Sequence, residues 1–111
     1  TEFGLQVRKG AEEATTIGVD ARCAELFVDR RRSGDLSFAK SFAAEHRAPL
    51  ALELGRVRLQ IFVDACSVEV FADGGRTVIS DLIFPDPQSR GVELYSRGGE
   101  ATLGSLDVFG L

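Results

Sequence analysis

The chain has 111 residues and a formal charge of −4 at pH 7, and hydrophobic residues make up 44% of it. This length predicts a single domain, and this composition is typical of a globular chain and not of a disordered one. The acidic balance argues against a nucleic-acid partner, and no apolar run approaches the ~20 residues that a membrane-spanning helix needs.

The first half of the chain shows the alternation of apolar and polar residues that is typical of β-strands. It predicts strands at Phe3–Val7, Ala14–Asp20 and Ala24–Val28, with a short fourth at 36–38. The polar stretch 30–34 is expected to form a turn, with its arginines on a rim. Residues 39–49 have mixed polarity and are predicted to form a loop, in which His46 is solvated or caps a turn.

The second half carries stronger strand patterns. They predict strands at Val57–Val63, Ser67–Ala72, Arg76–Phe84, Gly91–Ser96 and Glu100–Leu111. The run Asp73-Gly74-Gly75 is typical of a tight turn, because glycine reaches positive φ without a Cβ penalty. Pro85 and Pro87 end a strand, because proline lacks the N–H donor. Short strands at this spacing predict an antiparallel sandwich or barrel.

The two cysteines give no metal signal. Cys23 and Cys66 stand alone, without a C-x-x-C pair or a histidine at metal-binding spacing. Both are expected to be buried free thiols, with a single disulfide left open. No metal and no cofactor are predicted.

A catalytic pair of carboxylates in a glycosidase needs a separation of ~5–5.5 Å in retaining enzymes and ~6.5–9.5 Å in inverting ones. Glu69 and Asp73 lie on one strand face four residues apart, so they stand about 13 Å from each other. Glu25 and Asp29 have the same spacing. A pair across neighbouring strands stays open, and no nucleophile elbow or phosphate loop accompanies it.

Aromatic rings recur on the polar side of the predicted strands, each two residues from a carboxylate. They are Phe27, Phe62, Phe71 and Tyr95. Exposed rings mark an interaction surface, which has two interpretations here. The rings and carboxylates can line a sugar-binding surface, where rings stack on apolar sugar faces and carboxylates accept hydroxyl hydrogen bonds. Alternatively, the rings dock on a neighbouring domain, or the inner and outer sides are reversed.

The segment Ile61–Gly75 reads IFVDACSVEVFADGG. It resembles the signature hairpin of the C-terminal domain of family 32 glycoside hydrolases, which has a VD-x-S-S-V-E-V-F stretch followed by an Asn/Asp-Gly turn. Cys66 stands where the family commonly has serine. Three further segments match in order: Leu26–Arg30 with Ser33-Gly34, Ile83–Pro85, and Gly91–Ser96 with Gly98-Gly99.

The resemblance implies an all-β fold: a two-layer antiparallel β-sandwich of jelly-roll or concanavalin-like type, packed beside a five-bladed propeller. In the family, the propeller carries the catalytic carboxylates within W-[MS]-N-D-P-N-G, R-D-P and E-C motifs. None of these motifs occurs here, and the chain has no Trp, so no catalytic residue is expected. Because the chain has no Met, residues 1–111 are expected to be one N-terminally truncated C-terminal domain of a longer enzyme.

The resemblance also implies partners and candidate sites. Family members include levanases, inulinases, invertases and sucrose-6-phosphate hydrolases, so the parent is expected outside the cell in the first case and in the cytoplasm in the last. Their sandwiches stabilise the propeller or mediate homodimerisation, and related modules bind fructan. Candidate carbohydrate-binding residues are Glu25, Asp29, Arg30, Asp64, Glu69 and Arg97, and candidate interface residues are Phe27, Phe62, Phe71 and Tyr95.

Overall fold

The structure is a computed structural model, and it describes residues 1–32, 45–52 and 55–108. Eight strands form in these ranges: β1 (Glu2–Lys9), β2 (Ala14–Asp20), β3 (Glu25–Arg32), β4 (Glu45–Pro49), β5 (Leu59–Val63), β6 (Ser67–Ala72), β7 (Thr77–Leu82) and β8 (Gly91–Arg97). They form a five-stranded antiparallel sheet with the order β4-β3-β2-β1-β8 and a three-stranded antiparallel sheet with the order β5-β6-β7. The predicted β-sandwich is confirmed.

The core lies between the two sheets, as the period-two pattern requires. Each sheet contributes the apolar residues of one face, and the largest of them are fully buried. They are Ile17, Val19, Leu26 and Val28 from the five-stranded sheet, with Val68, Val70, Ala72, Ile79 and Ile83 from the other side. The strands therefore have defined inner and outer faces, and the outer faces are the surfaces open to partners.

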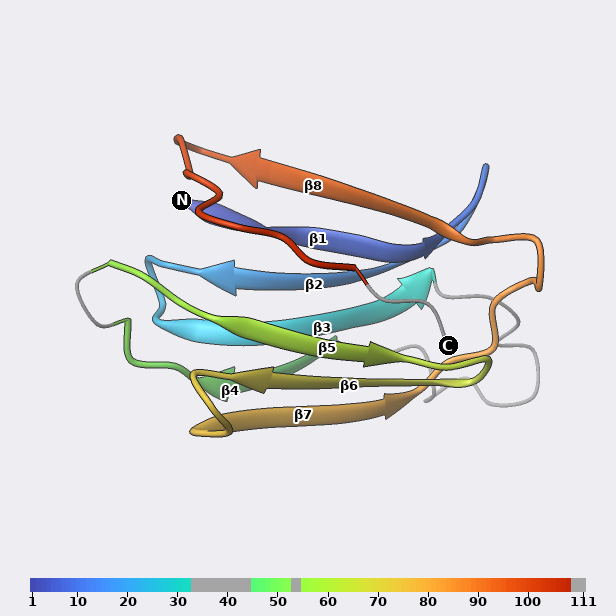
Figure 1. Ribbon diagram of the computed structural model, residues 1–111, viewed down its shortest axis with the longest axis horizontal. Coiled ribbons are helices and arrows are strands. Elements are labelled where there is room, and N and C mark those ends of the chain that lie inside the picture. Colours follow the sequence, from blue (N-terminus) through green and yellow to red (C-terminus); the bar gives the residue numbers. More distant parts are fainter. Residues whose placement is uncertain (33–44, 53–54, 109–111) are drawn as a thin grey trace.

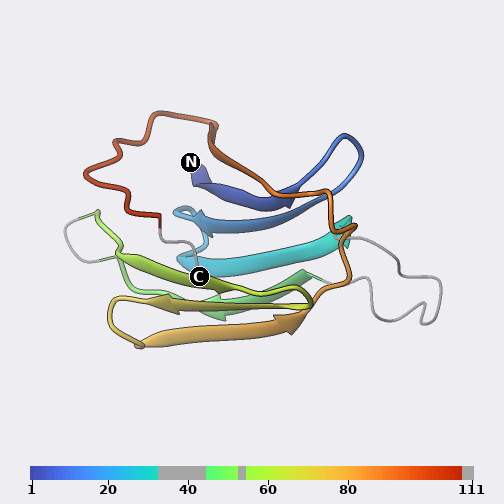
Figure 2. The same cartoon turned by 45° about the vertical axis from the view of Figure 1, so that its right-hand side comes forward.

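The two layers overlap only in part. The three-stranded sheet covers the β3–β4 side of the larger sheet, while β1 and β8 extend beyond it (Figure 1). Figure 2, a turned view, shows the same offset. As a result, Val92 and Leu94 on β8 remain largely exposed. Within the described ranges, no helix is long and apolar enough to cross a membrane.

Local sequence explains the turns. At the β6–β7 hairpin, Asp73, Gly74 and Gly75 all adopt positive φ, which confirms the predicted tight turn. Between β2 and β3, a carboxylate oxygen of Asp20 accepts hydrogen bonds from the N–H groups of Arg22 and Cys23 at 3.1 and 3.2 Å. This Asx-turn, closed by the Asp20 side chain, reverses the chain without a glycine.

The predicted loop 39–49 is wrong for its last part, because residues 45–49 form β4, an edge strand that pairs with β3. Pro49 is tolerated at the end of such a strand, where its missing N–H breaks no ladder bond. The turn expected at 30–34 is also wrong as far as it is described, since β3 continues through Arg32. The strand expected at 36–38 lies outside the described residues.

Two further expectations fail. The strand predicted at 100–111 is absent from its described part, 100–108, which turns back from the end of β8 with its side chains exposed (red in Figure 1). Cys23 and Cys66 are free, as expected, but exposed and not buried. Both lie in turns between strands, where the core does not reach.

Candidate functional site

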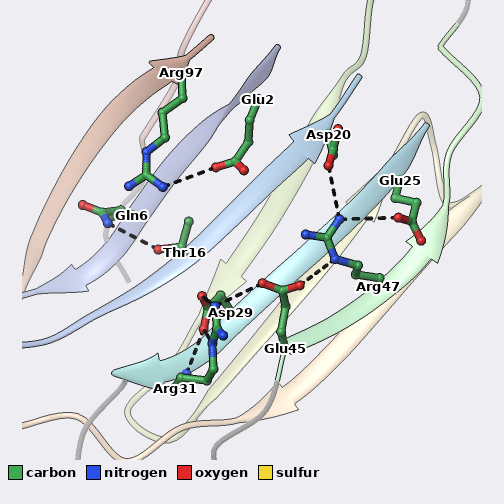
Figure 3. Close-up of polar contacts among 10 residues, drawn as sticks. All are labelled: Glu2, Gln6, Thr16, Asp20, Glu25, Asp29, Arg31, Glu45, Arg47 and Arg97. Atoms are coloured by element: carbon green, nitrogen blue, oxygen red, sulfur yellow. Dashed lines mark hydrogen bonds and ion pairs between the residues drawn. The ribbon is translucent and has the colours of Figure 1, made fainter. Parts of the chain in front are cut away.

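The outer face of the five-stranded sheet carries charged and polar side chains, and we call it the polar face (Figure 3). Strand register arranges its residues in three rows that cross the sheet. The first row is Glu25, Asp20, Glu2 and Arg97; the middle row is Arg47, Phe27, Gly18, Gly4 and Tyr95; the third is Glu45, Asp29, Thr16, Gln6 and Glu93.

The middle row brings two aromatic rings together over Gly18. A Cβ built on Gly18 would stand 2.4 Å from both the Cζ of Phe27 and the hydroxyl oxygen of Tyr95. The absence of a side chain at Gly18 therefore gives the rings room to fold inward from either side. The ring of Phe27 is only 3% exposed, so it belongs to the packed structure of this face.

Arginines cover both rings. The guanidinium carbon of Arg47 lies 4.9 Å from the Phe27 ring centroid, and that of Arg97 lies 5.3 Å from the Tyr95 centroid. These are cation–π distances. The rings are thus held under guanidinium groups and do not form open platforms on which a sugar can stack.

The Tyr95 hydroxyl is buried beside the Glu2 carboxylate. Burial, followed by the nearby Glu2 carboxylate, raises the pKa of Tyr95 well above its usual range. The hydroxyl therefore stays protonated, because ionising it would place a negative charge in a desolvated position beside a carboxylate.

Ion pairs tie the rows together. Arg47 reaches three carboxylates, at 2.5 Å to Glu45, 3.4 Å to Glu25 and 3.5 Å to Asp20. Figure 3 shows the contacts of Arg47, which lies on β4, with all three acids. Arg31 makes a two-point contact with Asp29 at 3.0 and 2.6 Å. The opposite charges on this face are therefore largely paired within the sheet.

The register does bring acids together, as the sequence left open. Glu2, Asp20 and Glu25 are direct cross-strand neighbours on β1, β2 and β3, a relation that places Cβ atoms about 5 Å apart. That spacing suits two catalytic carboxylates, but a glycosidase also needs one acid whose pKa is raised so that it can donate a proton.

The two carboxyl groups of this face with a displaced pKa are both displaced downward. Hydrogen bonds, the largest from the N–H of Cys23, lower the pKa of Asp20. Burial by itself raises the pKa of Asp29, but the hydrogen bonds and charge of Arg31 outweigh it, so this pKa is also lowered. Asp20 and Asp29 are therefore charged acceptors that can bind hydroxyl groups but cannot serve as proton donors near neutral pH.

Two hollows flank the aromatic row. One, of about 390 Å³, lies at the β2–β3 turn and is lined by Thr1, Glu2, Asp20, Arg22, Cys23, Arg97 and Gly98. The other, of about 230 Å³, lies at the β1–β2 hairpin and includes Gln6, Thr16, Asp29 and Arg32 in its lining. Charged side chains line both hollows, although much of the exposed lining of the larger one is apolar, and their sizes suit one sugar ring or a few waters. No group of His, Cys, Asp or Glu in the described part of the chain has the arrangement of a metal site.

The outer face of the three-stranded sheet differs from the polar face, and we call it the apolar face. It carries Gln60, Phe62, Ser67, Glu69, Phe71, Val78, Ser80 and Leu82. Phe62 is 51% exposed and Leu82 is 55% exposed. The rings of Phe62 and Phe71 meet edge to face, with centroids 5.8 Å apart. Exposed apolar side chains on adjacent strands indicate an interaction surface.

The structure divides the predicted site residues. Of the six sugar-binding candidates, Glu25, Asp29 and Arg97 share the polar face, and Glu69 lies on the apolar face. Asp64 lies in the β5–β6 turn, where its carboxylate accepts a hydrogen bond from the N–H of Ala65. Arg30 points between the sheets and donates to the Leu82 carbonyl at 3.0 Å. These six residues therefore do not form one site.

The four interface candidates are also divided. Phe27 and Tyr95 lie on the polar face, while Phe62 and Phe71 lie on the apolar face, on the other side of the sandwich. Alternation placed each ring on the polar side of its strand, but it could not show that two different sheets carry them. A single partner surface can include one pair or the other.

Sequence reasoning missed several residues that shape these surfaces. Gly18 leaves room for the rings of the polar face, and Arg47 pairs with three of its acids. The sequence gives no signal for the role of Arg47. The only signal for Gly18 was a glycine inside an otherwise β-branched strand, which often marks close approach of another group. His46 was expected in a loop, but its Nδ1 lies 2.5 Å from a carboxylate oxygen of the buried Asp81.

Comparison with known proteins agrees with this fold. Residues 1–110 match the family described as glycosyl hydrolases family 32 C terminal. The chain is 47% identical to a levanase from Bacillus sp. (strain L7) over 111 residues, which is 100% of this chain and 12% of that protein. It is 46% identical to a levanase from Bacillus subtilis (strain 168), covering 96% of this chain and 16% of that protein.

A solved structure is similar as well. The crystal structure of exo-inulinase from Aspergillus awamori superimposes with a TM-score of 0.85 at 40% identity, over 88% of this chain and 20% of that one. The chain thus spans between about an eighth and a fifth of the length of these relatives.

Proposed function

The chain belongs to the C-terminal domain family of the family 32 glycosyl hydrolases, and on that premise we propose that it is a non-catalytic accessory sandwich. Its role is to stabilise the catalytic propeller of a longer enzyme that hydrolyses β-fructofuranosides, as the names of the levanase and exo-inulinase relatives suggest. Catalysis is assigned to the remainder of that longer chain.

One observation carries this proposal: the acids that the fold brings together are paired with arginines on an open sheet. Arg47 contacts Asp20, Glu25 and Glu45. Displaced carboxyl pKa values on this face are lowered, where a general acid would require a raised one. The hollows beside these acids are shallow parts of a surface and do not exclude water, which electrostatic catalysis requires.

The catalytic half of the proposal is tested by incubating the 111-residue chain with levan, inulin and sucrose. No fructose release is expected, whereas the full-length enzyme releases it under the same conditions. Circular dichroism with a strand spectrum confirms that the chain is folded. Release that disappears in the Asp20→Asn or Glu25→Gln variant would show that this face is catalytic, and the proposal would fall.

The accessory half is tested by deleting the domain from the full-length enzyme. We expect the truncated enzyme to lose Tm and to aggregate at a lower temperature than the parent, because an apolar contact surface becomes exposed. A truncated enzyme with an unchanged Tm would contradict a stabilising role. Activity per folded molecule, measured at low temperature, separates this effect from any loss of catalytic groups.

A second candidate function is fructan binding, and the larger hollow of the polar face favours it. Glu2, Asp20 and Arg97 line this hollow of about 390 Å³, and together they offer acceptors and a donor for sugar hydroxyls. The observation supports binding of a terminal sugar by hydrogen bonds, without the ring stacking that Arg47 and Arg97 prevent.

Affinity electrophoresis of the folded chain through a gel that contains levan tests this second function. Retardation that Asp20→Ala abolishes would support it. Glu69→Ala is the matched control, because Glu69 lies on the opposite outer face and its removal is expected to change nothing. Migration unaffected by levan would exclude a binding role for this domain.

A further inference from the structure

The two outer faces of the sandwich differ in what contact with a partner requires. On the polar face, the charged groups of Arg47, Asp29 and Arg97 would lose water if another domain covered them. Removing such pairs from water is unfavourable unless the partner replaces every hydrogen bond. On the apolar face, covering Phe62, Val78 and Leu82 removes apolar surface from water, which is favourable.

We infer that the apolar face of the three-stranded sheet, centred on Phe62 and Phe71, is the surface that docks on the rest of the longer chain, and that the polar face remains in solvent. This inference rests on the proposed accessory function and names the contact surface that the function uses. It assigns Phe62 and Phe71 to the interface and leaves Phe27 and Tyr95 outside it.

The register makes the apolar face continuous. Phe71 on β6 stands between Gln60 on β5 and Val78 on β7. Leu82 lies one strand away, opposite Ser67, and Phe84, which is 38% exposed, follows two residues beyond the end of β7. The one charged side chain of the face within these strands is Glu69, which stands between Phe62 and Ser80. Apolar contact therefore runs across all strands of this sheet.

The size of the face argues for a covalently connected partner. Three strands of about six residues form a face of roughly 17 Å by 14 Å. The area of this face is far below the ~800 Å² that each partner of a stable free complex contributes. A domain on the same polypeptide is present at a high effective concentration, so a small contact suffices. The chain spans 12% of one levanase and 20% of the exo-inulinase structure, and sequence outside it is therefore available as the occupant.

Thiol labelling of the full-length enzyme tests this inference. The exposed Cys23 and Cys66 are first replaced by serine, because both would react. Single cysteines are then introduced as Phe62→Cys and Leu82→Cys on the apolar face and as Glu93→Cys on the polar face. Glu93 is a matched control, because it is exposed, as Phe62 and Leu82 are. A melting curve for each variant shows that it is folded.

We expect Phe62→Cys and Leu82→Cys to react at least tenfold more slowly than Glu93→Cys, at every protein concentration. Equal rates at Phe62→Cys and Glu93→Cys would show that the apolar face is open and would overturn the inference. Protection that disappears on dilution would assign the face to a second copy of the enzyme, and protection of all three positions would place contacts on both faces. Either result also overturns it.

The outcome is independent of the accessory function itself. If domain deletion lowers the Tm while Phe62→Cys reacts freely, the accessory role stands and this face assignment is wrong. If deletion leaves the Tm unchanged, the accessory role is wrong whatever the labelling shows.

Discussion

The imidazole Nδ1 of His46 lies 2.5 Å from the Oδ1 of Asp81, and this contact joins β4 of the five-stranded sheet to β7 of the three-stranded sheet. The side chain of Asp81 is only 3% exposed, and Arg30 approaches the same oxygen at 3.9 Å. Nearby, the Thr77 hydroxyl donates to the Pro49 carbonyl at 2.7 Å. Hydrogen bonds from polar side chains thus connect β4 to β7 at one edge of the sandwich.

Replacing Asp81 with Ala is expected to destabilise the domain by about 1–3 kcal/mol, because Arg30 and His46 lose a buried acceptor. Urea denaturation measures the change, and Ser80→Ala, an exposed neighbour on β7, is the control. A double-mutant cycle with His46→Ala is expected to give a coupling of about 0.5–3 kcal/mol. Additive effects would show that the two side chains do not interact.

Gly18→Ala is expected to lower the free energy of unfolding by about 1–3 kcal/mol, the typical cost of overpacking. The added Cβ would stand 2.4 Å from the Phe27 ring and from the Tyr95 hydroxyl, so both rings must move. Gly104→Ala is the matched control, because nothing lies within 4 Å of its Cβ position. An unchanged unfolding midpoint for Gly18→Ala would contradict the packing of the middle row.

Stability should fall in acid partly through Asp29. The hydrogen bonds and charge of Arg31 outweigh the effect of burial and lower its pKa in the folded state below the 3.8 of an unperturbed carboxyl. The folded state therefore gains stability above the unfolded pKa, and this gain is lost as pH falls through the folded pKa.

Asp29→Asn is accordingly expected to flatten the loss of Tm below about pH 4, measured by calorimetry from pH 2 to pH 6. Asp107→Asn removes the same charge at an exposed position in the segment after β8 and serves as the control. If the Tm of Asp29→Asn fell as steeply with decreasing pH as that of the parent, the ion pair between Asp29 and Arg31 would not contribute to acid stability.

Arg47→Ala is expected to cost about 1 kcal/mol, because partly exposed ion pairs contribute little individually and the Phe27 ring loses its cover. Arg47→Lys should restore part of the charge interaction but not the planar contact with the ring. Measuring unfolding at low and high salt separates the two contributions, since salt weakens the partly exposed ion pairs far more than the contact with the buried ring. If high salt abolished the difference in unfolding free energy between Arg47→Ala and the parent, the ring contact would not contribute.

The sequence predicted the strands whose side chains alternate strongly, because one residue in two must be buried. The runs that became β1, β2, β6 and β8 lie close to their predicted bounds. Prediction failed at β4, where polar His46 and Arg47 conceal an edge strand. Edge strands bury little, so pairing with a neighbour decides their conformation and composition does not. It failed again at 100–108, where alternation exists without a partner in the described structure.

The family and the two-layer fold were therefore determined by the sequence alone, because local alternation and one motif carry that information. The tertiary structure alone decided which outward residues share a surface. Glu25, Asp29 and Arg97 meet because the register of five strands aligns them, whereas Glu69 is carried to the opposite side by another sheet. Register and sheet membership depend on contacts between residues far apart in the chain, and a local pattern does not encode them.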